Sequence, residues 1–214
     1  MRYLIALMAV LLIVFGFTSR ASAATLGDYG YYVTGSTYTS TTADWTMPSL
    51  TCGATSTNSV AIWTGLDGIT SATVEQIGAD VECVSGKAEY SGWYDLYPAA
   101  AIDFSNTLKA GDGLDASVTY DGSSKFTLTL DDVTAGWDKT VTGTVSGAAR
   151  SSAETIVEAP NTLACTPTKT LASFTGDTVD GTALGSLHPS LITGGDPDIT
   201  VSSVSGKTFS VTCT

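Results

Sequence analysis

The sequence predicts an all-β fold in which two antiparallel sheets stack as a sandwich. From Tyr29 onward the chain is rich in Thr, Ser, Val, Gly and Tyr, and its short apolar runs are interrupted by Gly, Asp or Pro. No amphipathic stretch keeps a helical period for three turns, whereas apolar and polar residues alternate repeatedly. Many short strands of this kind favour two packed sheets, each with one face buried and one face free.

The clearest predicted hairpin joins Ala116–Tyr120 to Lys125–Leu130 through the turn Asp121–Ser124. In its second strand one Phe and two Leu alternate with polar residues, so one face is core and the other is solvent-exposed. Further strands are expected at Tyr29–Tyr38, Thr41–Thr46, Ser59–Leu66, Thr73–Val81, Ala88–Tyr97, Lys139–Ser146 and Glu154–Glu158. The tail after Pro160 is irregular, and we expect it to close the sheets with short strands near Leu171–Phe174, Ile199–Val204 and Thr208–Thr214.

The N-terminus has the pattern of a secretory signal peptide. Arg2 precedes an apolar run from Tyr3 to Phe17, and Ala21-Ser22-Ala23 follows as a small-residue cleavage site. We therefore expect residues 1–23 to be a signal peptide and residues 24–214 to form a single secreted domain. No second hydrophobic stretch reaches membrane length.

The predicted mature chain is strongly acidic. The formal net charge is −12, and loss of the two arginines of the signal peptide lowers it to −14. Such a chain repels nucleic acid and anionic membranes. Its pI of about 4.1 suits an acidic environment.

Cysteine and histidine usage restricts the chemistry further. An even number of cysteines in an exported chain favours disulfides, and of three possible pairings we expect Cys52–Cys83 and Cys165–Cys213, because each closes a local unit. The single histidine, His188, is accompanied by neither a His-Glu-x-x-His nor a Gly-x-Ser-x-Gly motif. A zinc site or a serine triad is therefore not expected.

Alternation along the predicted strands brings polar and aromatic residues onto shared faces. Glu154 and Glu158 share one face of their strand, as do Trp63 and Asp67 of another. Glutamate is rarely placed on a strand face without solvent, a partner or a task. If these faces belong to one sheet, they form a groove lined by Trp63, Asp67, Gln76, Asp80, Trp93, Asp95, Tyr97, Glu154 and Glu158.

Four blocks of the sequence resemble, in order and spacing, those of the glutamic peptidases, or eqolisins: Trp63–Gly68, Glu75–Asp80, Trp93–Pro98 and Ala153–Pro160. The similarity covers most of the chain after the signal peptide and is weakest after Cys165. The resemblance implies a secreted, acid-active endopeptidase. It also implies a lectin-like (concanavalin A-like) sandwich of two curved antiparallel sheets with a Gln/Glu dyad on the concave face.

By this resemblance, Gln76 matches the catalytic glutamine and Glu158 matches the catalytic glutamate. Glu154 is expected beside them, or as the catalytic glutamate itself if the alignment is displaced. The positions that line the family's cleft correspond to Trp63, Asp67, Asp80, Trp93, Asp95 and Tyr97. The chain departs from the family pattern at Ile77, Asp95 and Thr155, which indicates altered packing and subsites.

The expected chemistry is peptide hydrolysis without a metal or an organic cofactor. A glutamate takes a proton from water and returns it to the leaving nitrogen, and a glutamine amide donates to the oxyanion without titrating. We expect polypeptide substrates, no nucleic-acid or membrane partner, and a monomer. We also expect insensitivity to pepstatin, because Asp-Thr-Gly and Asp-Ser-Gly are absent from the sequence.

Two other functions fit the same groove. A carbohydrate-binding, lectin-like sandwich would stack sugar rings on Trp63, Trp93 and Tyr97. A glycoside hydrolase would use Glu154 and Glu158 as acid and base, and same-face strand neighbours roughly 7 Å apart suit an inverting enzyme. Neither alternative explains why a glutamine lies among the carboxylates.

Overall fold

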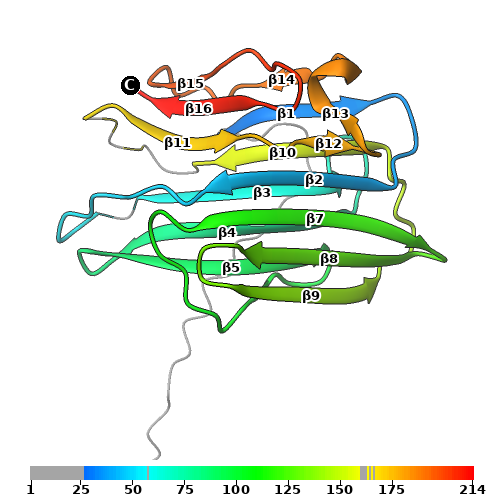
Figure 1. Cartoon of the computed structure of the whole chain (residues 1–214), viewed down its shortest axis with the longest axis horizontal. Helices are drawn as coiled ribbons and strands as arrows, with labels where there is room; N and C mark the ends of the chain where they lie inside the picture. The colour runs from blue at the N-terminus through cyan, green and yellow to red at the C-terminus, as the bar shows by residue number, and fades with distance from the viewer. Residues whose placement is uncertain (1–26, 57, 160–162, 164, 166) are drawn as a thin grey trace, which may run out of the picture.

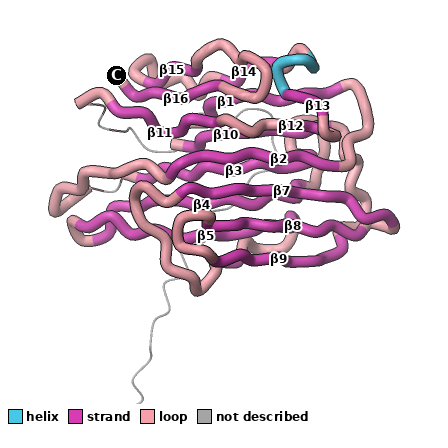
Figure 2. Tube along the Cα trace, in the orientation of Figure 1, coloured by secondary structure: helices cyan, strands magenta, loops and turns pink. Residues whose placement is uncertain are grey.

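The computed structural model describes residues 27–214 except residues 57, 160–162, 164 and 166. The predicted signal peptide lies outside the described residues. Strands in three sheets make up almost all of the regular structure (Figures 1 and 2), and one short 3₁₀ helix, η1, spans Leu184–Leu187. No helix in the described part of the chain is long and apolar enough to cross a membrane. The prediction of an all-β sandwich is confirmed.

Sheet A has seven strands and carries all of the predicted groove residues. Its spatial order is β14 (Ser190–Ile192), β1 (Asp28–Thr34), β10 (Ser152–Glu158), β3 (Ser59–Asp67), β4 (Val74–Val84), β5 (Lys87–Tyr97) and β6 (Ile102–Asp103). Neighbouring strands are antiparallel. Because β10 lies between β1 and β3, a strand from late in the chain occupies an interior position of the sheet.

Sheets B and C complete the molecule. Sheet B contains, in spatial order, β13 (Thr182–Ala183), β12 (Thr178–Val179), β2 (Ser40–Thr46), β7 (Gly113–Gly122), β8 (Lys125–Asp132) and β9 (Trp137–Thr144). Sheet C contains β11 (Lys169–Phe174), β16 (Phe209–Cys213) and β15 (Ile199–Val201). In Figure 1, β2, β7 and β8 run in front of β3, β4 and β5, as two layers of one sandwich.

The hydrophobic core fills the space between sheets A and B. Its fully buried side chains include Ile62, Leu66, Ile77, Leu114 and Leu128. The hydroxyls of Thr41 and Thr64 form a buried hydrogen bond of 2.9 Å between β2 and β3. Since Thr64 faces sheet B, its neighbours Trp63 and Gly65 face away from the core.

The strands predicted before residue 160 are present, with ends that differ by a few residues. β1 ends at Thr34 and does not continue to Tyr38, and Gly35 directly after it has a φ of 93°, outside the range of a strand. The predicted hairpin is also present, but its turn is shorter than expected. Ser123 and Ser124 alone form it, with φ values of 53° and 62°, which is typical of a two-residue hairpin turn.

The C-terminal segment follows its prediction in part. Its predicted strands form sheet C, which lies beside β1 (Figure 1), whereas β14 of the same segment extends sheet A, and β12 and β13 extend sheet B. The Tyr31 hydroxyl of β1 donates to the Ser202 carbonyl at 2.9 Å, and the Tyr31 ring meets Phe209 edge-on at 5.0 Å. Phe209 in turn stacks on Phe174. The ring of Phe174 also lies 6.2 Å from the ring of Trp45 in β2, so aromatic packing joins sheet C to the core that sheets A and B share.

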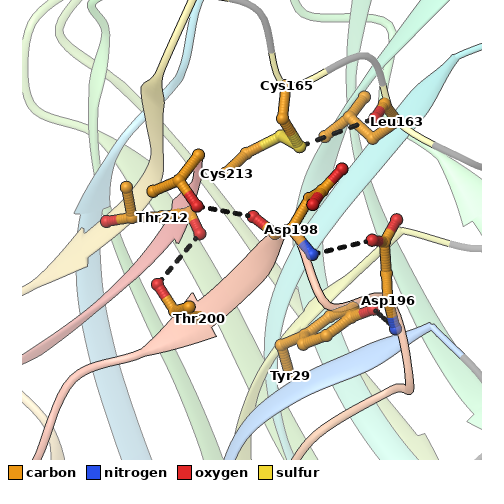
Figure 3. Close-up of a disulfide and its surroundings, with 9 residues drawn as sticks. Tyr29, Leu163, Cys165, Asp196, Asp198, Thr200, Thr212 and Cys213 are labelled. Carbon is orange, nitrogen blue, oxygen red and sulfur yellow. Dashed lines mark hydrogen bonds between the residues drawn. A yellow bond between two sulfur atoms is a disulfide. The ribbon is translucent and has the colours of Figure 1, made fainter.

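Both predicted disulfides, Cys52–Cys83 and Cys165–Cys213, are present. The second links the end of β16 to the segment that follows β10 (Figure 3). Beside it, the backbone N–H of Asp196 donates to the Tyr29 hydroxyl at 3.0 Å. Tyr29 lies opposite Val157 in the β1–β10 pair, so this end of the chain braces the strand that carries both glutamates.

Four aspartates form a row across the outer face of sheet B. The register pairs Asp44 with Asp115, Asp115 with Asp131, and Asp131 with Asp138. Carboxylates directly opposite one another on neighbouring strands repel. Partial burial and then the charges of Asp44 and Asp131 raise the pKa of Asp115. This row, the aspartate row, is therefore least unfavourable in acid.

Candidate active site

Strand register arranges the predicted groove residues in rows across the outer face of sheet A, which we call the open face. The central row runs through β10, β3, β4 and β5 as Glu154, Gly65, Gln76 and Asp95. The next row is Ile156, Trp63, Gly78 and Trp93, and the row after it is Glu158, Ala61, Asp80 and Ser91. The prediction that these strands present their polar and aromatic residues on one face of one sheet is confirmed.

Gly65 separates the glutamate and the glutamine of the central row. A Cβ atom at this position would lie 3.0 Å from Gln76 Cβ and 3.4 Å from Cζ3 of Trp63. A side chain would therefore crowd both neighbours. With glycine in place, Glu154 and Gln76 flank a stretch of bare backbone.

Gln76 is held by the next residue of the row. Its side-chain Nε2 donates a hydrogen bond of 3.2 Å to Oδ2 of Asp95. Gln76 is only 3 % exposed and Asp95 is fully buried. The carboxamide of Gln76 thus has a defined direction within the open face.

Glu154 is a buried carboxyl group without a normal hydrogen-bond partner. It is 1 % exposed, and neither carboxyl oxygen has a hydrogen bond to another described residue. Burial raises its pKa well above the usual value; the nearby Ser152 hydroxyl lowers it somewhat, and the charges of Asp67 and Glu75 raise it again. Glu154 therefore holds a proton in acid and remains able both to donate and to accept.

Glu158 lies two rows away from Glu154 on the same strand, level with Asp80 instead of Gln76. Burial raises the pKa of Glu158 to about 7, with a further contribution from Asp28, while a hydrogen bond from the Trp63 side chain lowers it. Burial also raises the pKa of Asp80 to about 7, although Ser91 Oγ donates to Oδ1 at 2.6 Å. This row is a second acidic site on the open face, but it contains no carboxamide.

The spacing of the two glutamates does not fit the predicted glycosidase geometry. Glu154 and Glu158 are four residues apart on an unbroken strand, which corresponds to about 13 Å. Inverting enzymes place their carboxyl groups about 6.5–9.5 Å apart and retaining enzymes about 5 Å apart. The expected 7 Å separation was wrong, because it applies to residues two apart and not four apart.

Asp67 lies on β3, in phase with Trp63 and Gly65. It is fully buried at the end of β3, where its φ of 66° turns the chain. Its carboxylate accepts hydrogen bonds from the backbone N–H groups of Arg150 at 2.6 Å and Ser151 at 2.8 Å, and from the Thr73 hydroxyl at 3.3 Å. Asp67 therefore fastens the start of β10 to the β3–β4 turn, and its charge is one of those that act on Glu154.

The predicted aromatic residues lie on the open face as partly buried side chains. Trp63 and Trp93 flank Gly78 in one row, and Tyr97 lies on β5, two positions beyond Asp95. A Cβ atom at Gly78 would lie 2.3 Å from the Ile62 carbonyl oxygen and 2.6 Å from Trp63 Cβ, which no larger residue can accommodate. The two indoles thus border a second patch of bare backbone.

Glu75, for which the sequence predicted no role, is a buried carboxyl group on the core side of β4. Glu75 is fully buried, and neither carboxyl oxygen has a hydrogen bond to a described residue. Burial raises its pKa to about 8, with further contributions from Asp67 and Asp95, whereas Thr73 and Arg150 lower it. The sequence signal for a buried glutamate was available, because Glu75 is in phase with the core residues Ile77 and Ala79.

Metal binding has no evident site in the part of the chain that the structure describes. No group of three or more His, Cys, Asp or Glu side chains there has an arrangement that could hold a metal ion. The arrangement on the open face instead offers proton transfer by a buried carboxyl group and hydrogen-bond donation by a carboxamide.

The fold and the open face define a class of β-sandwich protein in which a glutamate and a glutamine share one row of a sheet. Comparison with protein families gives the same result, because the model of the peptidase A4 family matches residues 28–187. The chain belongs to the peptidase A4 family, which confirms the resemblance to glutamic peptidases.

Individual relatives and structures are similar over large parts of the chain. Aspergillopepsin-2 of Aspergillus niger is 30 % identical over 138 residues, covering 55 % of this chain and 48 % of the relative. Scytalidopepsin B of Scytalidium lignicola is 32 % identical over 134 residues, covering 60 % of this chain and 50 % of the relative. The chain thus matches about half the length of each of these relatives.

Solved structures match more completely. The crystal structure of scytalido-glutamic peptidase with a transition state analog inhibitor has a TM-score of 0.71 and 26 % identity, over 86 % of this chain and 97 % of that one. Aspergilloglutamic peptidase from Aspergillus niger has a TM-score of 0.55 and 28 % identity, over 73 % of this chain and 99 % of that one.

Proposed function

We propose that this protein is an acid-active endopeptidase that hydrolyses polypeptides with a dyad of Gln76 and Glu154. The observation that carries the proposal is the central row, in which the two side chains flank Gly65. Membership of the peptidase A4 family and the likeness to a peptidase bound to a transition state analog inhibitor support it. No step requires a metal or an organic cofactor.

The geometry favours Glu154 over Glu158 as the catalytic glutamate. Glu154 is level with Gln76, whereas Glu158 is about 13 Å further along the strand. A donor and an acid that act on one carbonyl group must both reach it, so residues of the same row are the better pair. The role of Glu158 as the proton carrier, expected from the resemblance, stays a prediction that the experiment below tests.

The raised pKa of Glu154 defines the order of proton transfers in this proposal. As the oxygen of water bonds to the substrate carbonyl carbon, the unprotonated oxygen of the carboxyl group takes a proton from that water. Its other oxygen gives a proton to the substrate carbonyl oxygen, so a gem-diol forms and the carboxyl group remains neutral. An N–H of Gln76 donates to the carbonyl oxygen, where negative charge develops. The tetrahedral intermediate then breaks its C–N bond, as one of its hydroxyl protons passes through Glu154 to the leaving nitrogen.

Activity in this mechanism depends on the protonated form of Glu154. Since burial raises its pKa, the protonated form persists through the acid range and is lost as pH rises through that pKa. We therefore expect the rate to be high in acid and to fall toward alkaline pH. Pepstatin is expected to have little effect.

The test is acid proteolysis of casein by the wild type and by three variants. Gln76→Ala and Glu154→Gln should each lower kcat on the order of a hundredfold to a thousandfold with the fold preserved, as judged by circular dichroism. Glu158→Gln is the matched control, because it makes the same Glu-to-Gln change two rows away from Glu154. We expect it to lower kcat less than about tenfold. A severe loss in Glu158→Gln with near-normal activity in Glu154→Gln would reject the dyad.

A carbohydrate-binding function has one observation in its favour, the partly buried rings of Trp63, Trp93 and Tyr97 on the open face. Incubation of the wild type with polysaccharides at acid pH separates the two proposals. Binding of a polysaccharide without any peptide product from casein would support a lectin-like role and reject the peptidase.

We also propose that the protein is secreted and acts as a monomer. The signal-peptide pattern of residues 1–23 and the two disulfides support export to an oxidising environment. N-terminal sequencing of the exported protein and its mass in solution test both statements.

A further inference from the structure

We propose that Asp95 is a positioning residue that determines which end of the Gln76 carboxamide faces the substrate. This proposal rests on the proposed function, since it concerns the donor of the same dyad. Asp95 lies opposite Gln76 in the β4–β5 pair, on the side of Gln76 away from Glu154, and its hydrogen bond with the carboxamide lets it act through Gln76. Its role therefore differs from the cleft-lining role that the resemblance implies.

The chemistry of the two groups makes Asp95 selective. A carboxamide has a donor end and an acceptor end of nearly the same shape, and rotation by a half turn exchanges them. A carboxyl oxygen that carries no proton can only accept, so Oδ2 of Asp95 pairs with the NH₂ end of Gln76 and not with Oε1. The observed bond from Gln76 Nε2 to Asp95 Oδ2, at 3.2 Å, is the one that this rule requires.

The neighbour of Gln76 on the other side of the row cannot orient its carboxamide, so Asp95 determines the orientation. On the other side of Gln76 in the row is Gly65, which has no side chain to hold a carboxamide. Nε2 carries two hydrogens, and Asp95 engages one of them, so the second stays available as a donor. If the amide were reversed, Oε1 would take its place and would repel the developing oxyanion.

Loss of the fixed orientation of the Gln76 carboxamide should affect the chemical step more than substrate binding. Asp95→Asn keeps the size of the side chain but can accept or donate, so both orientations of Gln76 become possible. We expect kcat to fall on the order of ten- to a hundredfold, as for a misplaced catalytic group, with KM changed less than about threefold. The matched control is Asp138→Asn, an exposed aspartate of sheet B, which should leave both constants unchanged.

A double-mutant cycle tests whether Asp95 acts through Gln76. In the Gln76→Ala background, Asp95→Asn should lower kcat by less than about twofold, because the group to be oriented is missing. An equal loss in both backgrounds would overturn the proposal, since it would show an effect independent of Gln76. Absence of acid proteolysis in the wild type, or full activity of Gln76→Ala, would instead reject the proposed function.

A spectroscopic measurement tests the same contact without relying on activity. The side-chain ¹⁵N–¹H₂ signals of Gln76 can be assigned by their loss in Gln76→Ala. We expect one of its two protons to be shifted downfield by the carboxylate in the wild type and in Asp138→Asn, and to return toward the position of free amides in Asp95→Asn. Unchanged Gln76 signals in a folded Asp95→Asn protein would refute the positioning role.

Discussion

Replacing Glu75 by glutamine should raise the free energy of unfolding above neutral pH. The carboxyl group lies on the core side of β4, fully buried and without a hydrogen bond to a described residue, and its pKa is raised from 4.5 to about 8. Because the folded-state pKa is raised, folding is favoured by the protonated form. The stability is fully present below pH 4.5 and is lost as pH rises from 4.5 through about 8.

The magnitude follows from the shift. Each pKa unit corresponds to about 1.4 kcal/mol, so the rise from 4.5 to about 8 corresponds to a loss on the order of 5 kcal/mol between acid and alkaline pH. That is comparable with the whole stability of many domains, about 5–15 kcal/mol. Glutamine cannot ionise and has nearly the same shape, but its buried NH₂ group costs about 1–3 kcal/mol at every pH. Glu75→Gln should therefore be slightly less stable than the wild type at pH 4 and clearly more stable at pH 8.

Urea unfolding, followed by tryptophan fluorescence between pH 4 and pH 8, measures this difference. Glu89→Gln is a suitable control, because Glu89 is an exposed glutamate on the neighbouring strand β5. Its free energy of unfolding should follow that of the wild type within about 0.5 kcal/mol at each pH. If the difference in the free energy of unfolding between Glu75→Gln and the wild type were the same at pH 4 and pH 8, Glu75 would not ionise in this range, which would refute the prediction.

Three further predictions concern Gly65, the aspartate row and the C-terminal disulfide. Gly65→Ala should lower kcat by about tenfold or more and destabilise by about 1–3 kcal/mol, because the new Cβ crowds Gln76; kinetics and melting that match the wild type would contradict this. Asp115→Asn should raise the melting temperature at pH 7 and leave it nearly unchanged at pH 3, because the raised pKa of Asp115 makes its ionised form unfavourable only at higher pH; an equal shift at both pH values would exclude charge repulsion as the cause. Replacing Cys165 and Cys213 together by serine opens a link between residues 48 apart and should lower the free energy of unfolding by about 4 kcal/mol, measured by urea titration, and an unchanged midpoint would argue against that link.

Much of this architecture could be predicted, because the information is local. Alternation along each strand decides which residues share a face, so the open face with Trp63, Gln76 and Trp93 was predictable before any strand was paired. Both disulfides were predictable from separations along the chain. The resemblance of four short blocks to one family supplied the residue types of the site.

The remaining features depend on contacts between distant segments. Whether Glu154 or Glu158 is level with Gln76 is decided by the register of β10 on β3, and no residue near either glutamate encodes that register. The place of Asp67 depends on a positive φ at the end of its strand and on backbone N–H groups 83 and 84 residues away. Sheet C depends on aromatic contacts with β1, which short irregular strands do not reveal.

Gly65 and Gly78 have a consequence for how a peptide could be recognised. The two glycines leave bare backbone on the open face, but the strands that contain them are paired on both sides within sheet A. Their N–H and C=O groups are already committed to neighbouring strands, so a guest chain lying over them cannot join the sheet as an extra strand. Recognition has to come from the surrounding rings, carboxyl groups and carboxamide. Such a surface contacts the side chains of a bound peptide more than its backbone. Single substitutions around Gly65 and Gly78 can therefore change substrate selectivity while the two glycines stay the same.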